Sequence, residues 1–280
     1  MTIATERTTL IFRKIERDLL RLRKSQEPET VHRFRTASRR LQVLLEELSP
    51  NRDRNQKKLL KLLRRIRKRA GRIRDLDIQL SSLRSLKMPL EPRRKTQLTH
   101  HLIELRHKHE RKLAKLLTKN DVAEIGKRIR RSAKTFDATA TEDPLKVARQ
   151  MIASASRPTP SAIDDQLLHN YRTTVKRARY AAEFAQNSEQ AEQLRSQLKG
   201  LQDVLGQWHD WFTLTETASH ELGDITRSPL VAALHSVTRA KFRAAVAAIT
   251  AQARQSESSA SHVRKFESKT SSELVAAAAA

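Results

Sequence analysis

The chain has 280 residues, of which 38% are hydrophobic and 31% charged, and it carries a formal net charge of +25. A protein with this charge repels itself and attracts polyanions. The absence of cysteine excludes disulfides, thiolate metal sites and thiol nucleophiles. No window approaches the run of about 18 apolar residues that a membrane span needs. The chain is long enough to bury one large core or two small ones.

Apolar residues recur at helical spacing, and only 5 glycines and 8 prolines interrupt them, so we expect an all-α protein. In the first half, helices are predicted at about 6–24, 28–48, 54–85, 92–119 and 121–134. In the second half, they are predicted from Pro144 to about Ser156 and near 164–187, 190–219 and 228–254. Residues 255–280 are polar and then alanine-rich, and we expect a disordered C-terminal tail there.

The charge is unevenly distributed along the chain. Residues 1–134 carry 39 basic and 15 acidic side chains, whereas residues 135–280 carry 17 and 16. A polyanion drawn in by long-range attraction should therefore meet the first half first. Arginine supplies 36 of the 56 cations, and its planar guanidinium can bind two phosphate oxygens at once.

One basic helical phrase occurs twice, as VHRFRTASRRLQVLLEE from Val31 and, 137 positions later, as LHNYRTTVKRARYAAEF from Leu168. At about 100° per residue, each copy forms an apolar face with a polar stripe beside it. The first apolar face contains Val31, Phe34, Ser38, Leu41, Leu45 and Leu48, and its stripe contains His32, Arg35, Arg39, Gln42 and Glu46. The second face contains Leu168, Tyr171, Val175, Ala178 and Ala182, and its stripe contains His169, Arg172, Lys176, Arg179 and Glu183. The two stripes predict an anion-binding groove to which each copy of the phrase contributes an equivalent set of side chains.

A second phrase also repeats, as LLRRIRKRAGRIRDLD from Leu62 and as QLKGLQDVLGQWHDWF from Gln197. Helical counting buries Ile66, Ala70, Ile73 and Leu80. It places Arg67 and Arg74 beside that face, with Gln202 and His209 as their counterparts. Arg65, Lys68 and Arg72 are expected on a solvated face. A glycine inside a helix costs about 1 kcal/mol relative to alanine, so Gly71 and Gly206 predict close helix–helix approach.

These phrases, His-x-x-Arg-x-x-x-Arg-Arg and Leu-Gly-x-x-x-Asp, resemble those of the CHAD domain, the histidine-containing α-helical domain. The resemblance covers most of residues 6–254. It implies two four-helix bundles, 1–134 and 135–254, related by a pseudo-twofold axis around a basic central channel that binds inorganic polyphosphate. Members of the family are often associated with polyphosphate granules.

The resemblance also implies which side chains bind polyphosphate. His32, Arg35, Arg39 and Arg40 match the first basic motif, and His169, Arg172, Lys176, Arg177 and Arg179 match the second. Arg74 matches the arginine before the first aspartate, and the alignment of the paired motifs adds Arg67. The chain departs from the pattern at Gln42, where another arginine is common, and at His209, where a polar uncharged residue is common.

The histidines also raise the question of catalytic or metal-binding roles. His32 and His169 have the chemistry of general acids or phosphoryl acceptors, but we favour a binding or packing role, with affinity rising as pH falls through about 6.5. His100, His101, His107 and His109 are close in sequence without the spacing of a metal site, so a solvated helix face is favoured. No metal or cofactor is predicted.

Three function classes remain open. We favour a non-catalytic polyphosphate-binding protein over an RNA or DNA backbone binder and over an enzyme that acts on phosphoanhydrides. Aromatic residues make up only 4% of the chain, which provides few platforms for base stacking. No acidic cluster for magnesium and no glycine-rich nucleotide loop are evident. The N-terminus lacks the apolar stretch of a signal peptide, so we expect a cytoplasmic protein that does not insert in membranes.

Overall fold

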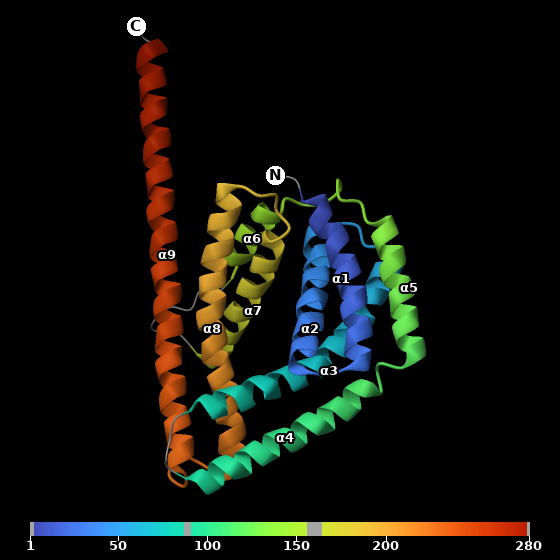
Figure 1. The fold of residues 1–280 in the computed structure, drawn as a ribbon. Coiled ribbons are helices and arrows are strands. Elements are labelled where there is room, and N and C mark those ends of the chain that lie inside the picture. Colours follow the sequence, from blue (N-terminus) through green and yellow to red (C-terminus); the bar gives the residue numbers. More distant parts are fainter. Residues whose placement is uncertain (1–2, 87–90, 156–163, 279–280) are drawn as a thin grey trace.

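The computed structural model describes residues 3–86, 91–155 and 164–278, with side chains described as far as residue 254. Within these residues the regular secondary structure is helical, apart from one isolated bridge between Ile3 and Ala185. The all-α prediction is thereby confirmed. The helices, drawn in Figure 1, are α1 (Thr5–Lys24), α2 (Pro28–Val43), the π-helical turn η1 (Leu44–Leu48), α3 (Arg54–Ser85), α4 (Pro92–Ala114), α5 (Lys119–Thr135), α6 (Pro144–Ala153), α7 (Asp165–Ala182), α8 (Glu189–Leu222) and α9 (Pro229–Ala278).

Capping side chains determine where several helices begin. Asp53 accepts a hydrogen bond from the backbone N–H of Gln56 at 2.7 Å, and the Gln56 side chain accepts one from the Asp53 N–H at 3.2 Å. This reciprocal pair satisfies two amide donors that the first turn of α3 leaves without helical partners. Thr118 caps α5 in a similar way, accepting from the Asp121 N–H at 3.1 Å. Because the chain turns before this cap, α4 ends at Ala114 and not near residue 119 as predicted.

The start of the chain pairs with the end of α7. The backbone N–H of Ala4 donates to the Phe184 carbonyl at 2.9 Å. Arg7 donates to the carbonyls of Glu183 and Ala185 at 2.6 and 2.8 Å. These carbonyls therefore serve a contact between the two halves, and α7 ends at Ala182, five residues before the predicted boundary.

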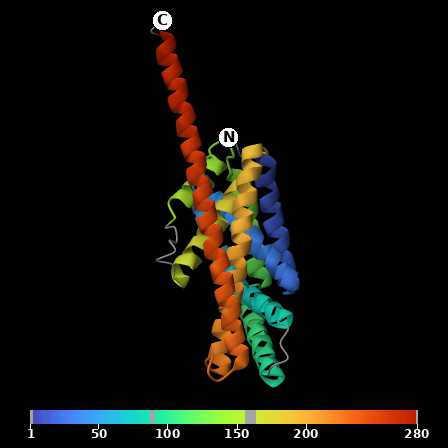
Figure 2. The same ribbon diagram turned by 90° about the vertical axis from the view of Figure 1, so that its left-hand side faces the viewer.

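The C-terminal helix α9 packs along α8, as Figure 2 shows from the side. Its bounds run to Ala278. The side chains of residues 255–280, where a disordered tail is predicted, lie outside the described residues, and that prediction stays a prediction. Within the described part of the chain, none of the helices is both long and apolar enough to cross a membrane.

The predicted apolar faces form the main core. All six positions of the first face and all five of the second are buried, and so are Ile66, Ala70, Ile73 and Leu80. The main hydrophobic cluster joins residues of both halves, from Ile3 to Ile249. A smaller cluster lies where the far ends of α3 and α4 meet α8 and α9. Across the halves, α2 packs on α7 and α3 packs on α8, so the two halves share their cores.

Phe34 provides a test of this shared core. Its side chain is fully buried on α2 within the main cluster. Phe34→Ala should lower the free energy of unfolding by about 3–5 kcal/mol, because it removes buried apolar surface and leaves a cavity. Urea denaturation measures this change. Leu20→Ala on α1 is the control, since Leu20 is 48% exposed and its loss should cost less than about 1 kcal/mol. Equal losses for the two variants would contradict the assignment.

Candidate anion-binding site

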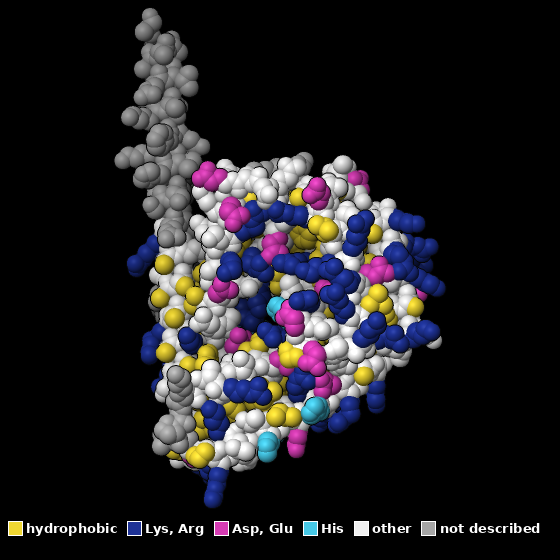
Figure 3. Space-filling view, in the orientation of Figure 1, with side chains coloured by type: hydrophobic (Ala, Val, Ile, Leu, Met, Phe, Trp, Pro, Cys, Tyr) yellow, Lys and Arg dark blue, Asp and Glu magenta, His cyan; other side chains and the backbone are white. Residues whose placement is uncertain are grey.

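Two cavities lie on either side of one wall of charged side chains. Figure 3 shows a hollow in the middle of one face of the molecule, with lysine and arginine side chains around it. The first cavity has a volume of about 510 Å³ and the second about 350 Å³. We call the residues that line both of them the shared wall. The shared wall consists of Arg35, Arg39, Asp75, Arg172 and Lys176.

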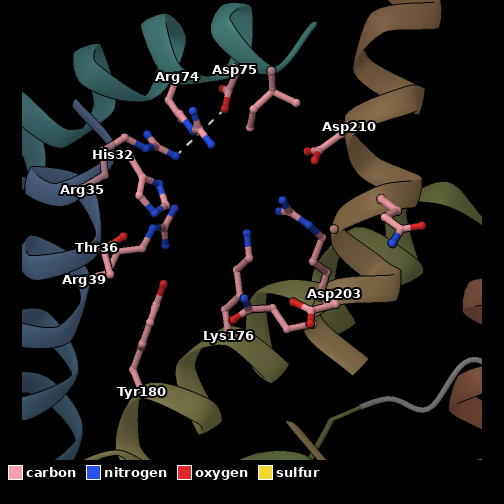
Figure 4. Close-up of a pocket in the computed structure, with 15 residues that line it drawn as sticks. His32, Arg35, Thr36, Arg39, Arg74, Asp75, Lys176, Tyr180, Asp203 and Asp210 are labelled. Carbon is pink, nitrogen blue, oxygen red and sulfur yellow. Dashed lines mark ion pairs between the residues drawn. The ribbon is translucent and has the colours of Figure 1, made fainter. Parts of the chain in front are cut away.

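The shared wall brings together two cations from each of the stripes that the sequence predicts. Arg35 and Arg39 lie one turn apart on α2, and Arg172 and Lys176 lie one turn apart on α7. Because α2 packs against α7, these four cations converge, and Figure 4 shows several of them pointing into the first cavity. Asp75 of α3 is the carboxylate of the wall, and its Oδ1 lies 4.0 Å from Arg35 Nη2.

Three of the wall's cations lack a neutralising partner. Within the described residues, no carboxylate oxygen lies within 4.0 Å of the side-chain nitrogens of Arg39, Arg172 or Lys176. The Nε of Arg172 is buried and has no hydrogen-bond partner. A buried donor without a partner costs about 1–3 kcal/mol. An anionic oxygen placed at this wall would satisfy such donors and the excess charge together.

Burial and the neighbouring cations both act on Lys176. Burial lowers the pKa of its ammonium to about 7, and the charges of Arg172 and Arg39 act in the same direction. The Asp210 carboxylate opposes the shift. Burial also lowers the pKa values of Arg35 and Arg172, although arginine stays protonated at neutral pH. Lys176 is therefore the cation of the wall whose charge changes near neutral pH.

The histidines beside the wall are held in their neutral form. Burial lowers the pKa values of His32 and His169, and Arg74 and Arg172 respectively add to the effect. Burial and Arg172 lower the pKa of His209 to about 3. Its ring lies against that of His169, with centroids 5.0 Å apart. Any gain in affinity from histidine protonation therefore belongs below the predicted pH of about 6.5.

Eight of the eleven predicted site residues line the cavities. Beyond the wall, His32 and Arg74 line the first cavity, and Arg67 and His169 line the second. Arg67 is also anchored, since its Nη1 donates to the Ser38 hydroxyl at 3.1 Å. The remaining lining residues of the first cavity are Thr36, Ile78, Tyr180, Gln202, Asp203, Gly206, Gln207 and Asp210. Those of the second are Arg64, Lys68, Gly71, Arg72, Thr173 and His209.

Three cations of the second cavity were missed by the sequence reasoning. Arg64 was not singled out, and Lys68 and Arg72 were expected on a solvated face. All three side chains are exposed, yet they line the opening of the cavity. The signal that identifies them is their spacing of four residues, which places all three on one side of α3.

The other three predicted residues lie outside both cavities, in contacts with acidic side chains. Arg40 Nε lies 2.6 Å from a Glu183 oxygen, and Arg177 pairs with Glu47. Arg179 pairs with Glu183 as well, donates to the Gln202 side chain at 2.7 Å and lies over the Tyr180 ring. The Arg40 and Arg177 pairs connect α2 and η1 to α7. Their guanidinium groups are occupied in holding the two halves together.

The predicted close helix–helix approach at the two glycines is wrong. A methyl group at position 71 would overlap the guanidinium of Arg35, so this glycine makes room for a side chain and not for a helix backbone. A methyl group at position 206 would meet nothing within 4 Å. Gly206 instead lines the first cavity and leaves that space open.

Equivalent positions of the two repeats line opposite cavities. His32 lines the first cavity and its counterpart His169 lines the second. Arg74 and Gly206 belong to the first cavity, whereas their counterparts His209 and Gly71 belong to the second. The pairs on the shared wall, Arg35 with Arg172 and Arg39 with Lys176, border both cavities. For these positions, exchanging one repeat for the other exchanges the cavities, whereas Asp75 lines both cavities and its counterpart Asp210 lines the first alone.

The histidines of α4 form contacts of their own. His107 Nδ1 lies 2.8 Å from Glu110, and His101 Nδ1 lies 3.1 Å from Glu221 at the end of α8. Throughout the described part of the chain, no three side chains of the types that bind metals are grouped together.

Comparisons with known proteins agree with this fold. No curated protein matches the chain at a significant level. Solved structures that share its fold include the following two. A crystal structure of the CHAD domain from the plant Ricinus communis is 19% identical, with a TM-score of 0.61, and the match covers 89% of this chain and 93% of that one. PptA from Streptomyces chartreusis is 16% identical, with a TM-score of 0.65, and the match covers 89% and 96%. The sequence model of the CHAD domain matches residues 8–219, and the chain therefore belongs to the CHAD domain family.

Proposed function

We propose that the protein binds inorganic polyphosphate, without turning it over, in the two cavities and across the wall between them. The observation that carries this proposal is the convergence of unpaired cations from both repeats, namely Arg39, Arg172 and Lys176. Membership of the CHAD domain family supports the same ligand class. We place this activity in the cytoplasm, in association with polyphosphate granules.

A linear polyphosphate suits the physical properties of the wall. It carries about one negative charge per phosphate and holds condensed counterions, which fixed cations release on binding. The cations of the wall project from packed helices, so little ordering is needed when the ligand arrives. Arg35, Arg39 and Arg172 present planar guanidinium groups that match phosphate oxygens. A phosphate oxygen would also give the buried Nε of Arg172 a hydrogen-bond acceptor.

The fold we infer around this ligand is a pair of pseudo-symmetric four-helix bundles enclosing a central channel. In support, each repeated helix packs on its own counterpart, α2 on α7 and α3 on α8. The exchange of cavities between equivalent positions is what a twofold axis through the shared wall produces. The two cavities are then the two mouths of one channel.

A nucleic-acid ligand fits this site less well. The major groove of B-DNA alone is about 12 Å wide, and a duplex is too thick for cavities of about 510 and 350 Å³. Single strands are usually bound by stacking bases on aromatic side chains. The aromatic side chain of the first cavity is Tyr180, which is buried. The site therefore favours a thin polyanion without bases.

Removing the wall's charge tests the proposal. Changing Arg35, Arg39, Arg172 and Lys176 to glutamine should weaken polyphosphate binding at least about a hundredfold, since each charge-assisted hydrogen bond contributes about 1.5–3 kcal/mol. The dependence of log K on log salt should become shallower by about 3. Isothermal titration calorimetry at several salt concentrations measures both quantities. The control changes four exposed residues outside the cavities, namely Arg52, Arg54, Lys61 and Arg65. Equal losses in the two variants would contradict the proposed site.

A competition experiment with duplex DNA tests the preference for polyphosphate. Duplex DNA at equal phosphate concentration should leave long-chain polyphosphate bound to the unaltered protein. Displacement by the duplex would overturn the selectivity and favour a nucleic-acid backbone binder.

Binding should also depend on pH through Lys176. Its pKa is about 7 in the free protein, and a bound anion favours the protonated form and raises that pKa. Affinity should therefore fall as pH rises from about 7, by up to about tenfold per pH unit while one proton is taken up on binding. Lys176→Arg keeps the charge at all these pH values and should flatten the dependence. Titrations from about pH 6 to pH 9 at constant ionic strength measure it. An equally steep dependence in Lys176→Arg would exclude Lys176 as its source.

The proposal that polyphosphate is bound without being cleaved is tested by measuring orthophosphate release. The carboxylates at the wall lie among cations, since Asp75 is 4.0 Å from Arg35 and the charges of Arg172 and Lys176 act on Asp210. Phosphoryl transfer relies on metal ions that neutralise the phosphate charge, and the cations around these two carboxylates would repel such ions. Long-chain polyphosphate incubated with the protein and magnesium should release no orthophosphate above the buffer control. Release that the wall variant abolishes would show an enzyme.

A further inference from the structure

The two mouths of the channel differ strongly in charge. Apart from the shared wall, the described residues that line the second cavity include four cations and no carboxylate. The first cavity is lined by one arginine, Arg74, and by the carboxylates of Asp203 and Asp210. The difference follows from the repeat, because Lys68 and Arg72 of α3 are replaced at the equivalent positions of α8 by Asp203 and Gln207. A polyanion is therefore held more strongly at the second mouth.

Exposed cations continue from the second mouth onto α4. Arg72 borders the second cavity, and Arg69 lies one turn before it on α3. The antiparallel helix α4 packs on α3 and presents Lys108 and Lys112 on one face. His109 lies among these four cations, and their charges, together with burial, lower its pKa. Its Nδ1 is buried without a hydrogen-bond partner. We call Arg69, Arg72, Lys108 and Lys112 the basic track.

Carboxylates neutralise other arginines of the chain but not the basic track. Arg33, Arg128 and Arg195 each pair with a glutamate on their own helix. On α4 itself, Glu110 pairs with Arg106, which also lies 2.6 Å from Asp77. No described carboxylate lies within 4.0 Å of a side-chain nitrogen of the track. The track thus keeps its full charge, in continuity with the mouth of the cavity.

We propose that a long polyphosphate chain leaves the channel on one side only, at the second mouth, and continues over the basic track on α3 and α4. This inference rests on the proposed function, since it assigns a path to the same ligand. The first mouth does not offer an equivalent path, because Asp203 and Asp210 repel the chain there. The track should therefore strengthen the binding of long chains and leave the binding of short ones unchanged.

Two probes of different length distinguish the track from the channel. The track variant changes Arg69, Lys108 and Lys112 to glutamine, and it spares Arg72 because that residue also lines the cavity. Its matched control changes Arg54, Lys57 and Lys61, three exposed residues of α3 outside both cavities. Affinities for tripolyphosphate and for long-chain polyphosphate are measured over a range of salt concentrations by calorimetry, with each chain in excess over the protein.

The track variant should lose at least about tenfold in affinity for the long chain, and its salt dependence should become shallower by about 2. Its affinity for tripolyphosphate should not change, and the control should behave like the unaltered protein with both probes. Equal affinity of track variant and control for the long chain overturns the inference. A loss of duplex DNA binding without a loss of polyphosphate binding overturns it as well and assigns the track to nucleic acid. If tripolyphosphate binding is insensitive to the four wall substitutions, the proposed function itself fails.

Discussion

The structure depends on holding like charges together against their mutual repulsion. Arg35, Arg39, Arg172 and Lys176 are brought into one wall by the packing of α2 on α7, and burial, together with the neighbouring charges, lowers the pKa of Lys176 to about 7. The opposing free energy comes from the apolar faces of the same two helices, which bury residues such as Phe34 and Val175 completely. An anion bound at the wall, as proposed, would relieve that repulsion. Under the proposed function, affinity and stability are therefore coupled through the same four side chains.

Ion pairs and backbone contacts between the halves hold the wall in place. Arg40 with Glu183 and Arg177 with Glu47 connect the helix ends beside the wall, and Arg7 binds the carbonyls at the end of α7. At the far end of the molecule, the Glu91 side chain accepts hydrogen bonds from the Ser228 hydroxyl and the Leu230 N–H at the start of α9. The cavities thus lie between two sets of fixed contacts, which hold the cations in position and would lower the entropic cost of binding the proposed ligand.

Sequence differences between the repeats make the two cavities unequal in charge. The shared wall is nearly symmetric in charge, since Arg35 and Arg39 face Arg172 and Lys176. Beyond the wall, equivalent positions lie in opposite cavities. The cations that α3 carries and α8 lacks therefore add positive charge to the second cavity and not to the first. The excess of positive charge in the first half of the sequence therefore appears in the structure as a difference in charge between the two cavities.

The sequence by itself determined the helices, their buried faces and the pairs of cations that meet, because these follow from periodicity and from a phrase that occurs twice. It did not distinguish Arg39 from its neighbour Arg40, which pairs with Glu183. One residue along a helix turns a side chain by about 100°, and Glu183 lies 143 positions from Arg40 in the sequence. Nor did it reveal that Gly71 accommodates Arg35 or that Lys68 borders a cavity. Only the tertiary structure decided which residues of each repeat line which cavity. That assignment depends on how α2 and α3 cross α7 and α8, and the crossing is set by side-chain packing between segments remote in sequence.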